Sequence, residues 1–144
     1  MENQKQILVV IALITDAEGR VLLQKRNDPE YPEVHGKWEF PGGTVDFGEH
    51  PEQALVRECR EEIGWEVEVG TLLPLVLSNV GFGESKQTQA IVMCYQAHIV
   101  KGEPRADDKE VLEIGWFIKQ EVVGLDTLPG IKESVALVVW CYAS

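Results

Sequence analysis

The feature that most constrains this chain is a helix-forming segment that begins at Pro51 and stops at Gly64. Proline favours the first position of a helix, and glycine favours the position just past its end, so the segment predicts a helix of about three to four turns. At roughly 100° per residue, one stripe of this helix is apolar and must face a core. The stripe consists of Leu55, Val56, Cys59 and Ile63.

Three carboxylates share the arc beside this stripe, those of Glu58, Glu61 and Glu62. Like charges three or four residues apart destabilise a helix by about a few tenths of a kcal/mol per pair. Arg57 can pair with Glu61, but one guanidinium does not neutralise three carboxylates. Clustered hard oxygen ligands suit Mg²⁺ or Mn²⁺, which also bind the phosphate oxygens of a substrate. Spacing alone leaves two interpretations open, a divalent-metal site and a solvated acidic face.

A glycine-rich loop leads into the helix. The run Pro41-Gly42-Gly43 ends a short predicted strand over residues 38–40, and Gly48 and Glu49 follow it. Glycine lets the backbone approach a ligand closely, so a carbonyl of this loop can serve as an additional metal ligand. Glu49 lies just outside the helix start, where a carboxylate can interact with the helix N-terminus or brace the loop. Loop and helix together predict a cradle for a metal–phosphate complex.

The rest of the chain alternates between strand, loop and helix patterns. Apolar runs over 7–14 and 21–23 around a short Gly-containing turn predict a β-hairpin whose first strand is buried on both faces. The other predictions are strands over 67–80, 90–100 and 113–117, loops over 27–37 and 103–113, and a last helix over 131–142. This mixture predicts an α+β fold with a sheet covered by helices on both faces.

Length and charge limit the function. The 144 residues fit one domain over 1–144, and the 13 basic against 24 acidic side chains give a net charge of −11. Such a balance argues against a nucleic-acid backbone or an anionic membrane as the partner. The three scattered cysteines, Cys59, Cys94 and Cys141, predict neither a disulfide framework nor a zinc ribbon. Without a signal-like or membrane-length apolar run, we expect a cytoplasmic protein.

The loop and the predicted helix carry a recognisable motif. It resembles the signature of the Nudix hydrolases, G-x5-E-x7-R-E-U-x-E-E-x-G-U, in which U is a bulky aliphatic residue. The matching residues are Gly43, Glu49, Arg57-Glu58-Cys59, Glu61-Glu62, Gly64 and Trp65. Cys59 and Trp65 depart from the U positions, the first by size and the second by being aromatic. The opening strands, the Trp38 to Gly43 approach and the late Trp116 strand resemble the MutT-like branch of the family.

This resemblance implies an α/β/α sandwich with a mixed β-sheet, and hydrolysis of nucleoside diphosphates linked to a further group X. It also implies that Mg²⁺, with Mn²⁺ as a substitute, is held by Glu58, Glu61 and Glu62 and by a backbone carbonyl of Gly42 or Gly43. Arg57 would orient the carboxylates, Glu49 would brace the loop, and Gly64 would end the helix.

A carboxylate from the loop before the Trp116 strand is a further implication of the MutT-like resemblance. Glu110 is the first candidate as a metal ligand or general base, with Asp107, Asp108 and Glu113 as alternatives. In the mechanism that we expect, water displaces a pyrophosphate oxygen at phosphorus, and a carboxylate takes the water proton. Glu58 is the first choice for this base and Glu110 the second.

A nucleoside triphosphate, cut to the monophosphate and pyrophosphate, is the expected substrate class. Residues 79–83 lack the markers of ADP-ribose and diadenosine polyphosphate hydrolases, and residues 119–131 lack the asparagine with which the MutT branch reads oxidised guanine. Arg26, Phe82 and Tyr95 are candidate substrate contacts. Other functions stay open: a hydrolase of nucleotide sugars or ADP-ribose, a non-catalytic Nudix-fold nucleotide sensor, or a calcium-binding protein. The expected partner is a small-molecule nucleotide, with a homodimer left open.

Overall fold

Two β-sheets and the helices around them make up the fold, as a computed structural model that describes residues 3–81, 87–106 and 109–143 shows. The strands are β1 (Lys5–Ile14), β2 (Val21–Arg26), β3 (Trp38–Glu39), β4 (Gly42–Thr44), β5 (Glu66–Val80), β6 (Thr88–Lys101) and β7 (Val111–Phe117). The helices are α1 (Pro51–Ile63), α2 (Lys119–Val123) and α3 (Ile131–Ala143).

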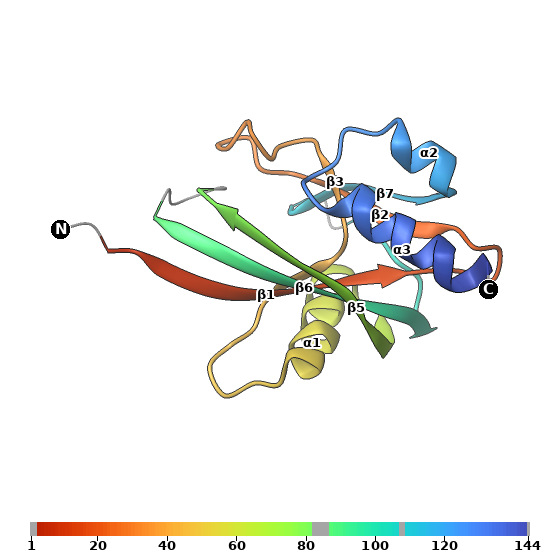
Figure 1. Ribbon diagram of the computed structural model, residues 1–144, viewed down its shortest axis with the longest axis horizontal. Helices are drawn as coiled ribbons and strands as arrows, with labels where there is room; N and C mark the ends of the chain where they lie inside the picture. The colour runs from red at the N-terminus through yellow and green to blue at the C-terminus, as the bar shows by residue number, and fades with distance from the viewer. Residues whose placement is uncertain (1–2, 82–86, 107–108, 144) are drawn as a thin grey trace.

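The larger sheet is mixed and has the strand order β4-β1-β6-β5. In it, β1 runs parallel to β6 and antiparallel to β4, and β5 runs antiparallel to β6. The smaller sheet is antiparallel, with the order β3-β2-β7. Figure 1 shows α1 beneath the larger sheet and α2 and α3 on the opposite side of that sheet. The predicted α+β class, with helices on both sides of a mixed sheet, is confirmed.

Two clusters of buried side chains bind these layers together. One joins the α1 side of the sheet through residues such as Ala12, Ile14 and Leu55, and the other joins the α3 side through residues such as Leu13 and Ile131. Successive residues of β1 thus enter opposite clusters, as the alternation of side chains along a strand requires. The prediction that this strand is buried on both faces is confirmed for its C-terminal half.

The predicted hairpin between the first two strands is wrong. The strands β1 and β2 lie in different sheets and meet only at a single bridge between Thr15 and Val21. The reason lies in the edges of β1, because β6 pairs with one edge and β4 with the other. On the second edge β4 pairs with Val9–Ile11, and β2 pairs with β3 and β7 instead. The short turn after β1 therefore passes the chain from one sheet to the other.

The helix predicted between Pro51 and Gly64 is confirmed at both ends. Its N-cap is His50, whose Nδ1 accepts a hydrogen bond from the Glu52 amide at 3.2 Å. Gly64 ends the helix with φ 68°, a left-handed conformation that glycine adopts without a steric penalty. Of the predicted apolar stripe, Leu55 and Cys59 are fully buried, Val56 is partly buried, and the side chain of Ile63 lies outside the described residues.

Both departures from the Nudix signature are buried, although the indole nitrogen of Trp65 has no hydrogen-bond partner among the described residues. Cys59 and Trp65 have no exposed surface and belong to the cluster on the α1 side of the larger sheet. Two details differ from the sequence prediction: the short helix α2 was not foreseen, and the loop predicted over 103–113 is shorter, because β7 begins at Val111.

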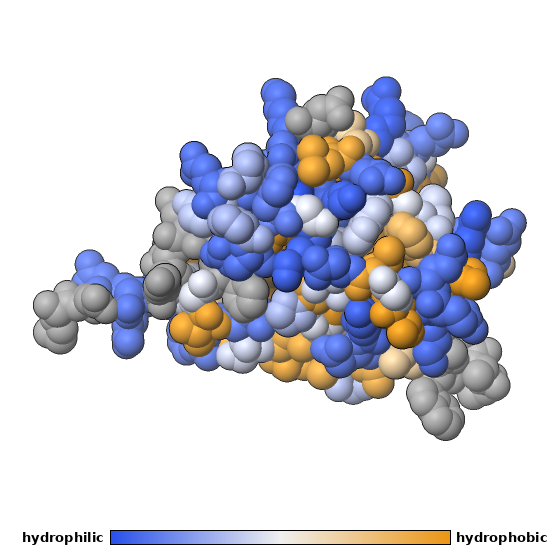
Figure 2. Space-filling view, turned by 90° about the horizontal axis from the view of Figure 1, so that it is seen from above, coloured by the Kyte–Doolittle hydropathy of each residue, from blue (hydrophilic) through white to orange (hydrophobic). Residues whose placement is uncertain are grey.

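The surface agrees with the acidic composition. Figure 2 shows mainly hydrophilic residues over the face seen from above, with hydrophobic residues in separate patches. Among the described residues, no helix is long and apolar enough to cross a membrane.

The burial of α1 leads to a stability prediction. Leu55→Ala removes a fully buried side chain and leaves a cavity, so we expect the free energy of unfolding to fall by about 2–5 kcal/mol. Leu72→Ala is the matched control, because Leu72 is 44% exposed on β5, and its loss should stay below about 1 kcal/mol. Urea denaturation measures both values. Equal losses would contradict the assignment of Leu55 to the core.

Candidate active site

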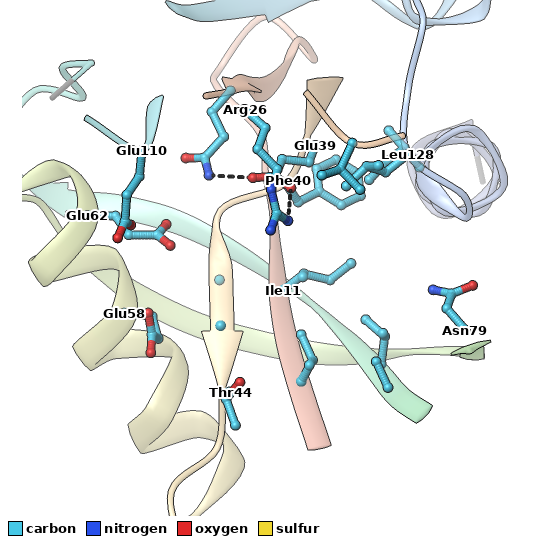
Figure 3. A pocket seen from close by; sticks show the side chains of 18 of the residues that line it. Ile11, Arg26, Glu39, Phe40, Thr44, Glu58, Glu62, Asn79, Glu110 and Leu128 are labelled. Carbon is cyan, nitrogen blue, oxygen red and sulfur yellow. Dashed lines mark hydrogen bonds and ion pairs between the residues drawn. The ribbon is translucent and has the colours of Figure 1, made fainter. Parts of the chain in front are cut away.

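A pocket of about 670 Å³ lies where α1 and β4 face β2 and β3. Six carboxylate residues are in its lining: the glutamates Glu39, Glu58, Glu62 and Glu110, and the aspartates Asp28 and Asp46. In Figure 3, Glu58 and Glu62 project from α1 toward β4, and Glu110 approaches Glu62 from the other side. Residues from the N-terminal third, the middle and the last third of the chain therefore meet in one acidic half of the pocket.

The glycine loop fits closely against α1. A Cβ atom at Gly43 would collide with the carboxylate of Glu58, so a larger residue here would require the Glu58 side chain to move. Burial and the neighbouring charges of Glu61 and Glu110 raise the pKa of Glu58, against the lowering effect of its hydrogen bond with Arg57. The backbone of Gly43 and the carboxylate of Glu58, whose pKa is raised, thus lie next to each other in the pocket lining.

Arg57 connects the loop to the helix. Its Nε and Nη2 donate to the two carboxylate oxygens of Glu49 at 2.8 Å and 3.0 Å, and Nη2 also donates to the Thr44 carbonyl at 3.1 Å. Its Nη1 donates to Glu58 at 2.9 Å and to Glu61 at 3.3 Å. The paired arginine and the Asp46 amide lower the pKa of Glu49 to about 2, so this carboxylate stays ionised. Glu49 therefore links Arg57 of the helix to the Asp46 amide of the loop.

Glu62 is a pocket carboxylate that forms no ion pair with the described residues. It accepts a hydrogen bond from the Gly42 amide, while its buried Oε2 has no hydrogen-bond partner. Burial first, and then the negative charges of Glu39 and Glu58, raise its pKa to about 8. An ionised carboxylate in such a place requires a cation, because burying an uncompensated charge is strongly unfavourable.

Glu39 is a site residue that sequence reasoning missed. It lines the pocket, accepts hydrogen bonds from Gln24 Nε2 at 3.2 Å and Arg26 Nη1 at 3.4 Å, and its pKa is raised, chiefly by burial. A signal was present in the sequence, because Glu39 alternates with the buried aromatics Trp38 and Phe40. An acidic side chain between two core positions of a strand must project from the opposite face, and here that face is the pocket.

Glu110, the candidate that the MutT-like resemblance implied, lines the same pocket as Glu39, Glu58 and Glu62. The Asn27 amide donates to the Glu110 carbonyl at 2.9 Å, and Asn27 Nδ2 donates to the Lys109 carbonyl at 2.7 Å. These bonds fix the backbone before β7 against the end of β2. Of the alternatives, Asp107 and Asp108 lie outside the described residues, and Glu113 pairs with Lys25 at 3.9 Å away from the pocket lining.

Among the remaining candidate residues, Arg26 lines the pocket, whereas Glu61 and Tyr95 do not. Glu61 is exposed and pairs with Arg57 outside the lining. Arg26 lines the pocket, where its guanidinium also pairs with Asp28 at 3.1 Å. Tyr95 is 6% exposed, packs in the cluster on the α1 side of the larger sheet and does not line the pocket. Phe82 lies outside the described residues.

The donor set fits a hard divalent cation. It consists of carboxylate oxygens, a buried oxygen of Glu62 without a partner, and the buried Oε1 of Gln24, which also lacks one among the described residues. Within residues 3–81, 87–106 and 109–143, no group of three or more His, Cys, Asp or Glu side chains is already arranged to hold a metal. Of the carboxylates of α1, Glu58 and Glu61 both form ion pairs with Arg57.

Comparison with known proteins matches residues 5–138 to the family described as the NUDIX domain. A Mycobacterium tuberculosis protein named "Putative 8-oxo-dGTP diphosphatase 2" is 35% identical over 131 residues, which are 91% of this chain and 86% of the relative. An Escherichia coli CTP pyrophosphohydrolase is 45% identical over 65 residues, covering 45% of this chain and 47% of that protein. A solved MutT NUDIX hydrolase from Burkholderia pseudomallei has a TM-score of 0.77 at 30% identity, with 92% of this chain and 98% of that chain covered.

The buried Glu62 predicts an unusual pH dependence of stability in protein kept free of metal by a chelator. Its folded pKa of about 8 lies above the ordinary value of 4.5, so the folded state holds a proton that the unfolded chain releases. The resulting stability is complete below about pH 4.5 and is lost as the pH rises toward about 8.

We therefore expect the melting temperature of the wild type to fall relative to that of Glu62→Gln between about pH 5 and about pH 8. Glu52→Gln, an exposed position in the first turn of the same helix, should follow the wild type. Thermal melts across this pH range measure the difference. Parallel curves for the wild type and Glu62→Gln would show that Glu62 titrates normally.

Proposed function

The chain belongs to the Nudix family, whose members act on phosphoric anhydride bonds of nucleotides, and on that premise we propose that it converts nucleoside triphosphates to monophosphates and pyrophosphate. The observation that carries the proposal is the acidic half of the pocket, where Glu62 is buried without a cation beside Glu39, Glu58 and Glu110. We also propose residues 1–144 as one Nudix hydrolase domain, supported by the family match over 5–138.

We assign the metal ligands to Glu58, Glu62 and Glu110 together with the carbonyl of Gly43, and the preferred ion to Mg²⁺, with Mn²⁺ as a substitute. Divalent ions bound there would neutralise phosphate oxygens and lower the pKa of the attacking water. The contact of Gly43 with Glu58 and the placement of Glu110 in the same pocket support this set. Glu61 would contribute to the site only if its ion pair with Arg57 were broken.

We propose Glu58 as the general base that takes the proton of the attacking water, with Glu110 as the second candidate. The raised pKa of Glu58 supports this role, because a general base works best when its pKa lies nearer the working pH. Arg57 holds the Glu58 carboxylate in place at 2.9 Å and is itself held by Glu49. Arg57 and Glu49 therefore position the Glu58 carboxylate.

Two observations support a nucleoside triphosphate as the substrate. The relatives named 8-oxo-dGTP diphosphatase and CTP pyrophosphohydrolase are named for triphosphate substrates. The pocket also contains an apolar half next to the carboxylates, which gives room for a nucleoside beside the metal-binding groups. Arg26, at the boundary between the two halves, is the candidate contact for a phosphate, although Glu39 and Asp28 already balance its charge.

The metal-binding roles predict that Glu58→Gln and Glu62→Gln each lower kcat by about two to four orders of magnitude while the fold is retained. The amide keeps the size of the side chain but removes its charge and basicity. Glu52→Gln is the control, because Glu52 lies on the same helix away from the pocket lining. Steady-state assays with saturating Mg²⁺ and circular dichroism measure both properties. Near wild-type turnover in both pocket variants would refute the proposed mechanism.

The substrate class is tested by incubating the protein and Mg²⁺ with nucleoside triphosphates, nucleotide sugars, dinucleotides and ADP-ribose, and identifying the products by mass spectrometry. We expect the monophosphate and pyrophosphate from triphosphates. Turnover confined to ADP-ribose or nucleotide sugars would contradict the proposed class. Binding of triphosphates without turnover would instead favour the non-catalytic sensor.

A further inference from the structure

The half of the pocket away from the carboxylates is apolar. Its side chains come from β1, β5, β6 and the segment that leads into α3: Ile7, Val9, Ile11, Leu77, Val92 and Leu128. The three β1 residues alternate along the strand and so face the same side of the sheet. Most of these side chains are only half-buried, which leaves an apolar wall that nothing else in the described chain covers. Such a wall suits a flat, weakly hydrated group.

Asn79 is a polar residue in this apolar half. It belongs to β5, where it pairs with Ala90 of β6, and it lines the pocket. Figure 3 shows its carboxamide on the far side of the pocket from Glu58, Glu62 and Glu110, with Ile11, Phe40 and Leu128 between them. Within residues 3–81, 87–106 and 109–143, no hydrogen bond involves this half-buried carboxamide.

On the proposed function, the nucleobase of the substrate would lie in this apolar half; we propose that the Asn79 carboxamide, which lines it, hydrogen-bonds the edge of the base and sets the base preference. This inference rests on the proposed function, because the carboxylates would then hold the polyphosphate at the opposite end. A polar group in an apolar pocket discriminates strongly, since a ligand that leaves it unpaired pays the full desolvation penalty.

The chemistry of the amide makes the proposal specific. A carboxamide offers one donor and one acceptor, and each nucleobase presents such a pair on its Watson–Crick edge. A carboxylate at the same position only accepts. Guanine alone offers two adjacent donors, N1–H and the N2 amino group, to a carboxylate. Asn79→Asp should therefore favour guanine over adenine, cytosine and uracil, each of which would place an acceptor against the new negative charge.

The experiment measures kcat/KM of the full chain for ATP, GTP, CTP and UTP with Mg²⁺. In Asn79→Asp we expect the ratio of GTP to each other nucleotide to rise by about tenfold or more. Any general effect of the added charge on the phosphates acts on all four nucleotides and cancels in the ratio. In Asn79→Leu we expect the differences among the four to shrink. Asn3→Asp, an exposed position outside the pocket, is the matched control and should leave the ratios unchanged.

A binding measurement separates this inference from the proposed function. Calorimetric titration with the four nucleoside monophosphates reports base recognition without turnover, and we expect the same shift toward guanine in Asn79→Asp. If the wild type cleaves no triphosphate, the proposed function fails, while a shifted monophosphate preference would still support the base site. If triphosphates are cleaved but neither Asn79 variant changes the ratios or the monophosphate affinities, the assignment of Asn79 is wrong.

Discussion

The arrangement of the pocket depends on the guanidinium of Arg57. It joins the loop to the helix by bonding Glu49 and the Thr44 carbonyl on one side and Glu58 on the other. The Glu58 carboxylate that Arg57 holds lies in the space that a side chain at Gly43 would occupy. Glu62 forms no ion pair with Arg57, and burial together with the charges of Glu39 and Glu58 raises the pKa of that carboxylate. The Arg57 network thus positions the loop, while the environment of Glu62 is set by burial and by the neighbouring carboxylates.

The two halves of the pocket have different origins in the fold. The acidic half forms where α1, β3 and the segment before β7 converge, so its carboxylates come from distant parts of the sequence. The apolar half is the uncovered part of the mixed sheet between β1, β5 and β6. A nucleotide has the same division between charged phosphates and a flat base. The match in polarity along the pocket is what makes a nucleotide a fitting ligand, beyond the presence of the carboxylate cluster.

Local patterns predicted much of this molecule, and competition among partners explains the rest. The ends of α1 follow from Pro51 and Gly64, and the strands β5 and β6 follow from their apolar composition, since such signals act within a few residues. The hairpin prediction failed because β6 and β4 already pair with β1. Sequence proximity alone could not reveal that competition. Helix α2 is too short to show a clear periodic pattern of its own.

By itself, the sequence determined that a carboxylate-bearing helix follows a glycine loop, because capping residues and spacing along a helix are local properties. It also indicated Glu110 as a further site residue through the family resemblance. Only the tertiary structure decided which carboxylates meet: Glu39 joins Glu58 and Glu62, while Glu61 remains outside with Arg57. It also placed Asn79 at the apolar end. Such meetings depend on which strands pair and how the layers pack, and these long-range contacts leave no local signal in the order of the residues.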